Sequence, residues 1–276
     1  MLDATQIAQF QADGFLLSGR VVDNDMVERL RGELDRVIND QDKPGVPQPV
    51  RLSNLGGDAE APVWQIVNIW RASDAYYQLI ELPTIIEEVQ QLTNARELRV
   101  WHDQIQYKPA KTGGVNMWHQ DGPLWRILQP KTLVSAWIAL DDVDQSNGCM
   151  SMVPGSHTWG DNNQQFQAMP DFDGLPTEFQ GRRVEPRRCP VPKGCVHYHH
   201  SLTWHGSHTN TSGQPRRAIA IHYMTEQTCY FANDTHVMKQ YVQVQDGAKL
   251  EGEHFPLVWD ESFAAREKKG AARLNG

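Results

Sequence analysis

A histidine and an aspartate two residues apart, His119 and Asp121 in the run NMWHQDG, have types and spacing that suit metal chemistry. In an extended strand, residues i and i+2 point to the same face, so an imidazole nitrogen and a carboxylate oxygen converge before Gly122 ends the strand. A third ligand from a distant strand would complete two histidines and one carboxylate, the facial arrangement that leaves three positions open on non-haem Fe(II). The pair therefore predicts a metal site that needs a partner elsewhere in the chain.

The third ligand is expected in the segment HYHHSLTWHGSHTN, which contains His197, His199, His200, His205 and His208. The sequence downstream favours His205, because His205-Gly206-Ser207 is followed by a turn-forming cluster at 210–215 and then by an alternating strand, a pattern that predicts a hairpin. His199 and His200 stay open. One of them would face the pocket as a substrate contact or acid–base group, or both would be strand histidines bonded to backbone carbonyls.

Arg216 begins the returning strand, in which Arg216, Ala218, Ala220 and His222 share one face. Two alanines beside an arginine leave room under the guanidinium for a small dicarboxylate, held bidentately by Arg216 at one end and by the metal at the other. The alternative is an ordinary surface arginine at a hairpin mouth. The order of His-x-Asp, His-Gly-Ser and arginine on β-rich segments favours the binding role.

The elements that must position these side chains are short β-rich runs separated by turn residues. Period-two strands at this spacing predict an all-β sandwich or barrel. The runs are LRVWHDQIQYK, KTLVSAWIAL, CMSMV, CVHYHHSLTW and RRAIAIHYM. Residues 155–183 show no clear period, which indicates a long excursion that acts as a lid or a solvated insert.

The first forty residues have a helical pattern, with a short helix through Phe10 and an amphipathic helix from Val22 to Ile38. A loop over 40–62 is expected to contain a short strand at Val50–Leu52, and a further helix to cover Pro83–Leu92. The terminal run REKKGAARLNG is expected to fray. These features predict a helical N-terminal layer packed on a double-sheet β core in a single domain.

Composition describes an ordinary globular chain of 276 residues with a formal net charge of −8. That charge disfavours nucleic acid and acidic membrane surfaces as partners. No run of about 18 apolar residues is present, and the first fifteen residues carry aspartate and glutamine where a signal peptide is apolar, so we expect a cytoplasmic protein. A small-molecule substrate is the expected partner, and the sequence does not indicate the oligomeric state.

The chain resembles the phytanoyl-CoA dioxygenase family of Fe(II)/2-oxoglutarate-dependent oxygenases. The resemblance rests on HQDG, SAWIALDDVDQSNGCMSMVPGSH and WHGSHTNTSGQPRRAIAIHYM, with QIAQFQADGFLL near the start. It implies a mainly β fold with flanking α-helices, a double-stranded β-helix (jelly roll, cupin-like). We therefore expect one dioxygenase domain over 1–276, with mainly helical support over 1–97, a jelly-roll core over 98–240 and a C-terminal extension over 241–276.

The resemblance also implies roles for individual residues. The iron ligands, which are also the catalytic residues, would be His119, Asp121 and His205, and Arg216 would bind 2-oxoglutarate. Trp137 matches a tryptophan that lines the cosubstrate pocket in the family, and Gln104 matches loosely a position that touches the cosubstrate. Members that halogenate lack the carboxylate ligand, so the presence of Asp121 favours hydroxylation or a related oxidation.

The implied reaction is the oxidation, most simply the hydroxylation, of an unactivated C–H bond with O2 and 2-oxoglutarate, releasing succinate and CO2. A small organic molecule or natural-product intermediate is the preferred substrate, contacted by Trp118, Trp125 and His199. A CoA ester would need a basic track for its phosphates. Two other functions remain as alternatives, a zinc-dependent hydrolase and a catalytically silent protein that binds 2-oxoglutarate or another ligand.

Overall fold

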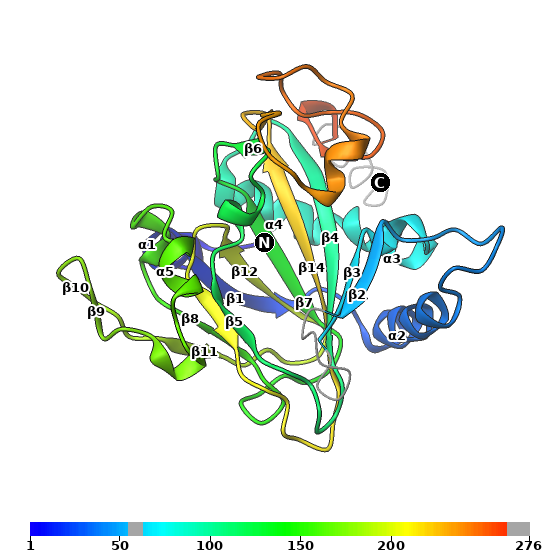
Figure 1. Cartoon of the computed structure of the whole chain (residues 1–276). Coiled ribbons are helices and arrows are strands. Elements are labelled where there is room, and N and C mark those ends of the chain that lie inside the picture. Colours follow the sequence, from blue (N-terminus) through cyan, green and yellow to red (C-terminus); the bar gives the residue numbers. More distant parts are fainter. Residues whose placement is uncertain (55–62, 264–276) are drawn as a thin grey trace, which may run out of the picture.

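The computed structural model describes residues 1–54 and 63–263, so the whole terminal run that is expected to fray lies outside the described residues. A major antiparallel sheet forms the centre of the molecule (Figure 1). Its strands in spatial order are β1 (Phe15–Arg20), β12 (Cys195–His200), β7 (Val134–Ala139), β14 (Arg216–Thr225), β4 (Leu98–Lys108), β3 (Trp64–Val67) and β2 (Arg51–Asn54), with β16 (Leu257–Trp259) also paired to β4.

A smaller antiparallel sheet faces one side of the major sheet. Its strands in order are β11 (Arg187–Cys189), β8 (Met150–Met152), β13 (His205–Ser207) and β5 (Asn116–His119). Two short pairs stand apart from both sheets, β6 (Leu128–Gln129) with β15 (Cys229–Tyr230), and β9 (Glu178–Phe179) with β10 (Arg182–Arg183). Two antiparallel sheets with helices outside confirm the predicted mainly β jelly-roll fold.

Helices cover the outer face of the major sheet. The α-helices are α1 (Ala4–Asp13), α2 (Asn24–Asn39), α3 (Asp74–Ile80), α4 (Pro83–Thr93) and α5 (Asn163–Gln167), the last of which lies in the 155–183 excursion. Local sequence explains the boundaries, since a capping box between Asp3 and Gln6 starts α1, and Asp23 caps α2 by accepting from the backbone N–H of Met26. The helices predicted at 22–38 and 83–92 are therefore confirmed to within two residues.

Side chains of β14 alternate between two apolar layers, as the sequence predicts. Ile219 and Ile221 belong to the core between the major sheet and the helices, whereas Ala218 and Ala220 belong to the layer between the two sheets. The second layer also contains Trp137 and leads to the open end of the jelly roll. Small alanine side chains leave space there for other groups to occupy.

Two local expectations are wrong. The first forty residues are not all helical, because the apolar start of β1 pairs with β12 at the edge of the major sheet, with Phe15 opposite His199. The segments around His205 and Arg216 do not form a hairpin either. β13 pairs with β5 and β8 in the small sheet, while β14 pairs with β4 and β7 in the major sheet, so the turn at 210–215 crosses from one sheet to the other.

The excursion over 155–183 contains short elements and lies outside the small sheet. It includes the 3-10 turns η3 (Ser156–Thr158) and η4 (Phe172–Gly174) besides α5, β9 and β10. Phe166 and Phe172 from this segment pack with Trp118 and Trp204. Across the parts of the chain that are described, no helix combines the length and the apolar character that crossing a bilayer requires.

Candidate active site

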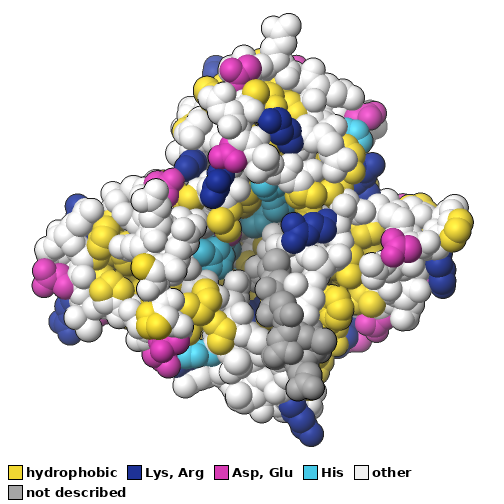
Figure 2. Space-filling model, viewed as in Figure 1, with side chains coloured by type: hydrophobic (Ala, Val, Ile, Leu, Met, Phe, Trp, Pro, Cys, Tyr) yellow, Lys and Arg dark blue, Asp and Glu magenta, His cyan; other side chains and the backbone are white. Residues whose placement is uncertain are grey.

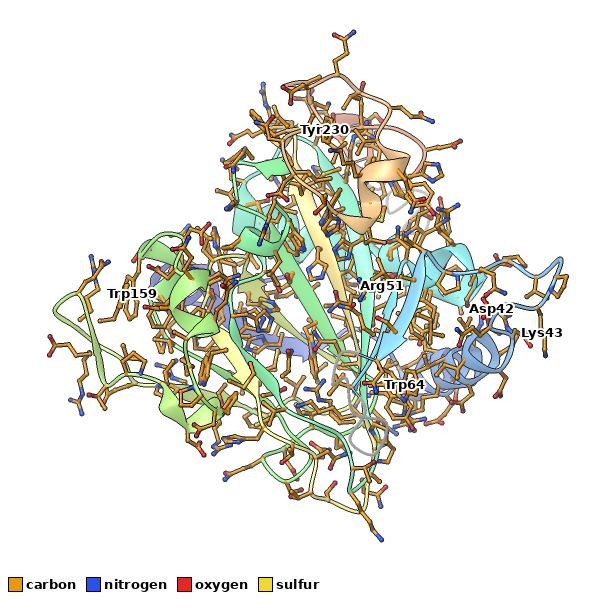
Figure 3. The ribbon with its side chains drawn as sticks, in the orientation of Figure 1. Asp42, Lys43, Arg51, Trp64, Trp159 and Tyr230 are labelled. Carbon is orange, nitrogen blue, oxygen red and sulfur yellow. The ribbon has the colours of Figure 1, made fainter. Side chains whose placement is uncertain are left out.

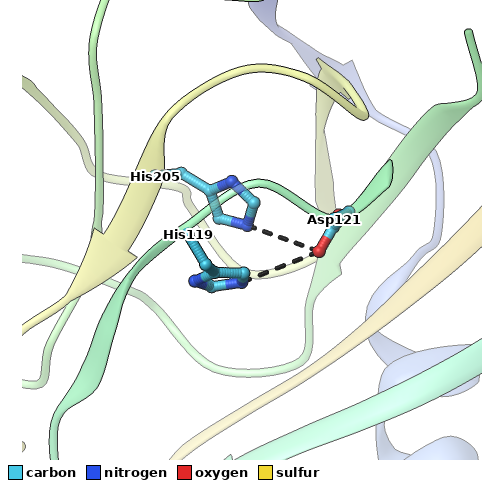
Figure 4. Close-up of side chains that lie close together, drawn as sticks. All are labelled: His119, Asp121 and His205. Carbon is cyan, nitrogen blue, oxygen red and sulfur yellow. Dashed lines mark ion pairs between the residues drawn. The ribbon is translucent and has the colours of Figure 1, made fainter. Parts of the chain in front are cut away.

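His119, Asp121 and His205 come together at the open end of the jelly roll (Figure 4). His119 is the last residue of β5 and lies directly opposite His205 of β13, and their ring centres are 4.1 Å apart. The Oδ1 atom of Asp121 lies 3.6 Å from Nε2 of His119 and 3.7 Å from Nε2 of His205. The potential ligand atoms all lie within 4.8 Å of one another, a spacing that suits one shared metal ion.

Backbone carbonyls orient both imidazoles. Nδ1 of His119 lies 2.7 Å from the carbonyl oxygen of Met117, and Nδ1 of His205 lies 2.9 Å from that of Thr203. A carbonyl only accepts, so each Nδ1 carries the hydrogen and each Nε2 presents its lone pair to the space beside Asp121. Such outer contacts fix the tautomer that a metal-binding histidine needs.

The conformation of Asp121 differs from the extended geometry that the sequence suggested. β5 ends at His119, and Asp121 has helical backbone angles (φ −69°, ψ −49°) as the residue before the 3-10 turn η2 (Gly122–Leu124). The intervening Gln120 explains the change. Its buried side chain donates to the carbonyls of Gly160 and Leu202, which turns the chain out of the strand. The two side chains still converge, through a turn instead of a shared strand face.

The second oxygen of Asp121 is held by a buried polar network. Oδ2 lies 3.3 Å from the hydroxyl of Ser135, which donates to it, and 3.3 Å from Nε2 of His199. The same hydroxyl lies 2.7 Å from Nδ1 of His222. With Oδ2 engaged by two donors, Oδ1 is the oxygen that remains for a metal.

The charge states at the cluster suit metal binding. Burial, with the charge of His205, lowers the pKa of His119 to about 4. Burial also lowers the pKa of His205. For Asp121, burial acts to raise the pKa, but His205 and the other nearby imidazoles outweigh it and hold the pKa well below its usual value. At neutral pH the cluster therefore offers two neutral imidazoles and one carboxylate.

Two buried cations lie on the interior side of the sheets, and neither pairs with a carboxylate among the described residues. Arg216 donates through Nη2 to the carbonyl of Gly148 and to the hydroxyl of Ser207, while its Nη1 is buried without a partner. Lys108 donates to the hydroxyl of Ser207 at 2.8 Å and to the carbonyl of His208. Burial lowers the pKa of Arg216 to about 10, and burial with the charge of Arg216 lowers that of Lys108. Buried charges normally have a counter-charge, so this pair suits the negatively charged end of an anion.

A narrow cavity is lined by Asp121 and His205 of the metal-ligand cluster and by Ser207. Arg216 and Lys108 do not line it, but both donate to the hydroxyl of Ser207 and so lie directly behind its wall. Trp137 lines its side, with the Arg216 guanidinium carbon 5.5 Å from the ring centre. Of the two residues that the resemblance assigns to the cosubstrate, Trp137 lines this cavity and Arg216 is buried next to Ser207. Gln104 does not line this cavity, although Gln106 does.

A larger cavity of about 410 Å³ opens on the other side of His119 and Asp121. Trp118, Trp125 and Gln104 line it, together with residues of β2, β3, β5 and η5 (Val237–Tyr241). Figure 2 shows histidine side chains in a hollow near the centre of this face, with Lys or Arg beside them. His199 does not line the larger cavity, because its buried ring faces Asp121.

The sequence interpretation assigned no role at the metal centre to four residues of the site. Lys108 is one of these four, yet its side chain is fully buried beside Arg216. The alternation His102, Gln104, Gln106, Lys108 places it on the interior face of β4, and this period-two pattern was a usable signal. Gln120, Ser135 and His222 act through contacts between distant segments, which no local pattern indicates.

Several known proteins are similar to this chain in sequence. The family model of phytanoyl-CoA dioxygenase (PhyH) matches residues 10–218. Peroxisomal phytanoyl-CoA dioxygenase of Rattus norvegicus is 24% identical over 249 residues, which cover 84% of this chain and 71% of the rat protein. Ectoine dioxygenase of Bordetella parapertussis is 23% identical over 237 residues, which cover 80% of this chain and 75% of that enzyme.

A solved structure extends the likeness to the fold. The crystal structure of SnoK, a non-haem α-ketoglutarate dependent carbocyclase from nogalamycin biosynthesis, has a TM-score of 0.77 and 26% identity, covering 94% of this chain and 97% of SnoK. The family match runs from α1 to β14 and includes every residue of the metal-ligand cluster and Arg216. This chain therefore belongs to the phytanoyl-CoA dioxygenase family.

Proposed function

We propose that this protein is an Fe(II)/2-oxoglutarate-dependent dioxygenase that oxidises a C–H bond of a small organic molecule, most simply by hydroxylation. In this proposal His119, Asp121 and His205 hold the iron. Two neutral imidazoles and one carboxylate oxygen are the donor set that suits non-haem Fe(II) with positions left open. When bound, the iron supplies the activation of O2, coupled to conversion of 2-oxoglutarate into succinate and CO2.

Arg216 and Lys108 are the proposed partners of the far carboxylate of 2-oxoglutarate. The observation that carries the proposal is this pair of buried cations, which have no carboxylate partner among the residues that are described. Both bond Ser207, which lines the same narrow cavity as Asp121 and His205. A metal-bound water in a hydrolase would need no such pair. Trp137 would orient the cosubstrate by limiting the width of the cavity.

The substrate would occupy the larger cavity beside His119 and Asp121. Trp118 and Trp125 offer apolar walls there, and the indole N–H of Trp118 is already bonded to the carbonyl of Phe172, which fixes the ring. A free molecule is favoured over a CoA ester, because Lys108 is buried at the cosubstrate end and Lys131 is paired with Asp161. The carbocyclase SnoK shows that the reaction type varies among structural relatives, so cyclisation is the alternative outcome of the same C–H oxidation.

The test is a screen for substrate-stimulated release of succinate from 2-oxoglutarate under air, with Fe(II) or with Zn(II) in its place. We expect succinate and O2 consumption with Fe(II) alone, and stimulation by a small organic molecule that leaves the reaction with one added oxygen or a new ring. Hydrolysis supported by Zn(II) without succinate would favour the zinc hydrolase. Binding of 2-oxoglutarate with no turnover across the screen would favour the silent binding protein.

A further inference from the structure

The walls of the larger cavity carry an unusual number of amide side chains. Gln65 of β3, Gln104 and Gln106 of β4, and Asn116 of β5 all line it. Gln65 lies directly opposite Gln106 across the paired strands, so two of the amides are cross-strand neighbours. Gln65, Gln104 and Gln106 lie on neighbouring strands of the major sheet, and Asn116 lies on the small sheet beside His119. We call these four side chains the amide band of the cavity.

None of these four amide side chains makes a hydrogen bond to another described residue. The buried amide of Gln120 is fully engaged by contrast, since its Nε2 donates to two backbone carbonyls and its Oε1 accepts from the backbone N–H of Asn162. Each free amide in the cavity offers an acceptor and two donors. Covering such groups with an apolar molecule would cost free energy, so the band favours a ligand with several hydroxyl or carbonyl oxygens.

Two residues that line the larger cavity are charged, one negatively and one positively. Asp121 is the only carboxylate among the described lining residues, and it belongs to the metal centre. Arg51 of β2 is the only cation among the same residues, and Figure 3 shows it beside β3, toward the centre of the molecule. Arg51 bonds Ser53 through Nε, and no carboxylate in the described chain pairs with it.

The other basic groups of the cavity add no charge at neutral pH. Burial lowers the pKa of His102 well below its usual value, and burial together with the charge of Arg51 lowers the pKa of His236 to about 4. The wall away from the metal is therefore singly positive, in a chain whose formal net charge is −8. A cationic substrate would meet Arg51 without a compensating carboxylate.

We propose that the substrate is an oxygen-rich organic anion, whose negative group is bound by Arg51 and whose hydroxyl or carbonyl oxygens bond the amide band. The inference rests on the proposed function for the identity of the site as a substrate cavity. The volume of about 410 Å³ lies in the range of about 300–1,000 Å³ of pockets that enclose drug-sized ligands. A single cation suits one carboxylate or sulfonate, and not the several phosphates of a CoA ester.

Two fluorescent probes of matched shape test the charge preference. 8-Anilino-1-naphthalenesulfonate carries one sulfonate, and N-phenyl-1-naphthylamine is its uncharged counterpart. Both are titrated into the full chain with Zn(II) and 2-oxoglutarate added, so that the anion does not compete for Arg216. We expect Arg51→Gln to weaken binding of the sulfonate about tenfold, and Arg51→Glu to weaken it further, with the uncharged probe changed by less than about twofold.

Two further variants provide a control for the loss of a positive charge and a test of the amide band. Arg29→Gln, on the exposed side of α2, should change neither affinity. Gln104→Leu should raise the affinity for the uncharged probe about fivefold, because a free amide no longer has to lose water. The proposal is overturned if the sulfonate shows no saturable binding, if Arg51→Gln leaves its affinity unchanged, or if both probes lose affinity equally. Failure of the proposed function would instead appear as absence of succinate from the wild-type protein.

Discussion

The metal-ligand cluster and the larger cavity lie side by side but differ in how their polar groups are satisfied. At the cluster, the second nitrogen of each histidine and the second oxygen of Asp121 are all hydrogen-bonded within the protein. In the cavity, the amide band has no partners among the described residues. The protein therefore builds the geometry for the chemistry in advance and leaves recognition of the substrate to be completed by the ligand.

The buried cations Arg216 and Lys108 are intermediate between these two regions. Their positions are fixed by hydrogen bonds to Ser207 and Gly148, as at the cluster, but their charges are not compensated, as in the cavity. The two side chains are therefore held rigidly, while their positive charges still lack a negative partner among the described residues. The pair should bind an anionic group tightly, and the affinity should fall strongly on the loss of either cation.

Removal of a metal ligand should have the largest effect and tests whether the cluster is the rigid region. We expect His205→Ala to weaken Fe(II) binding by more than about a hundredfold, since changes beyond the ligands already cost about 10–100-fold. Anaerobic titration of Fe(II) measures the affinity. His200→Ala is the matched control, because that ring contacts His157 and the backbone of Leu202, outside the cluster. Full iron binding by His205→Ala would contradict the assignment.

Loss of a buried cation should follow in size and tests the intermediate region. Arg216→Ala should weaken 2-oxoglutarate binding about a hundredfold, and Lys108→Met about tenfold, with metal affinity nearly unchanged. Calorimetric titration with Zn(II) in place separates the two affinities. Arg217→Gln is the control, because the side chain of Arg217 bonds Asp141 and not Ser207. If the control lost as much cosubstrate affinity as Arg216→Ala, a general effect of charge would explain the loss.

The network behind Asp121 should give a moderate effect. Ser135→Ala removes a donor to Oδ2 and the link to His222, so metal affinity should fall about tenfold while the fold remains intact. Ser151→Ala, in β8 of the small sheet, is the matched control without a side-chain hydrogen bond in the described chain. Equal metal affinities for the two variants would mean that the second oxygen of Asp121 needs no support.

The smallest predicted effect is on the pH dependence of the free energy of unfolding, through His236 in the wall of the larger cavity. The pKa of His236 is about 4 in the folded protein and 6.5 ordinarily, because of burial and the charge of Arg51. As the pH falls from 6.5 to 4, the unfolded chain gains the proton first, so His236 contributes stability above this window and loses it through the window. His236→Asn keeps an N-cap acceptor for the backbone N–H of Met238.

For the metal-free protein, urea unfolding at several pH values measures this contribution. The free energy of unfolding of His236→Asn should fall less steeply between pH 6.5 and 4, by up to about 1.4 kcal/mol per pH unit. Equal slopes for wild type and variant would show that His236 takes up its proton equally in the folded and unfolded chain.

The sequence predicts the parts of the site that local patterns encode. His119, Asp121, His205 and Arg216 stand in short motifs, and alternation in β14 assigns Arg216 to the interior face. The sequence does not predict that Asp121 leaves the strand, because the cause is the side chain of Gln120 bonding carbonyls 40 and 82 residues away. Pairing of distant segments decides such details.

In the fold, too, local sequence predicts some elements, whereas pairing between distant segments decides others. The helix over 24–39 follows from its cap and spacing, and the helix over 83–93 begins with a proline in its first turn. By contrast, β1 lies in a segment with a helical pattern and pairs with a strand far along the chain. The expected hairpin between His205 and Arg216 has correct turn residues, but each strand finds its partners elsewhere. Turn chemistry identifies where a chain changes direction and not which sheet it enters next.

The connection between β13 and β14 has a consequence for how the two sheets hold together. His205 belongs to the small sheet and Arg216 to the major sheet, and the turn between them is one of several places where the chain crosses from one sheet to the other. A metal ion held by His205, with a dicarboxylate running from it to Arg216, would add a bridge across this seam to the hydrogen bonds that Ser207 accepts from Arg216 and Lys108. Because such ligands would bind only the folded chain, the cosubstrate would also raise the free energy of unfolding of the enzyme that it serves.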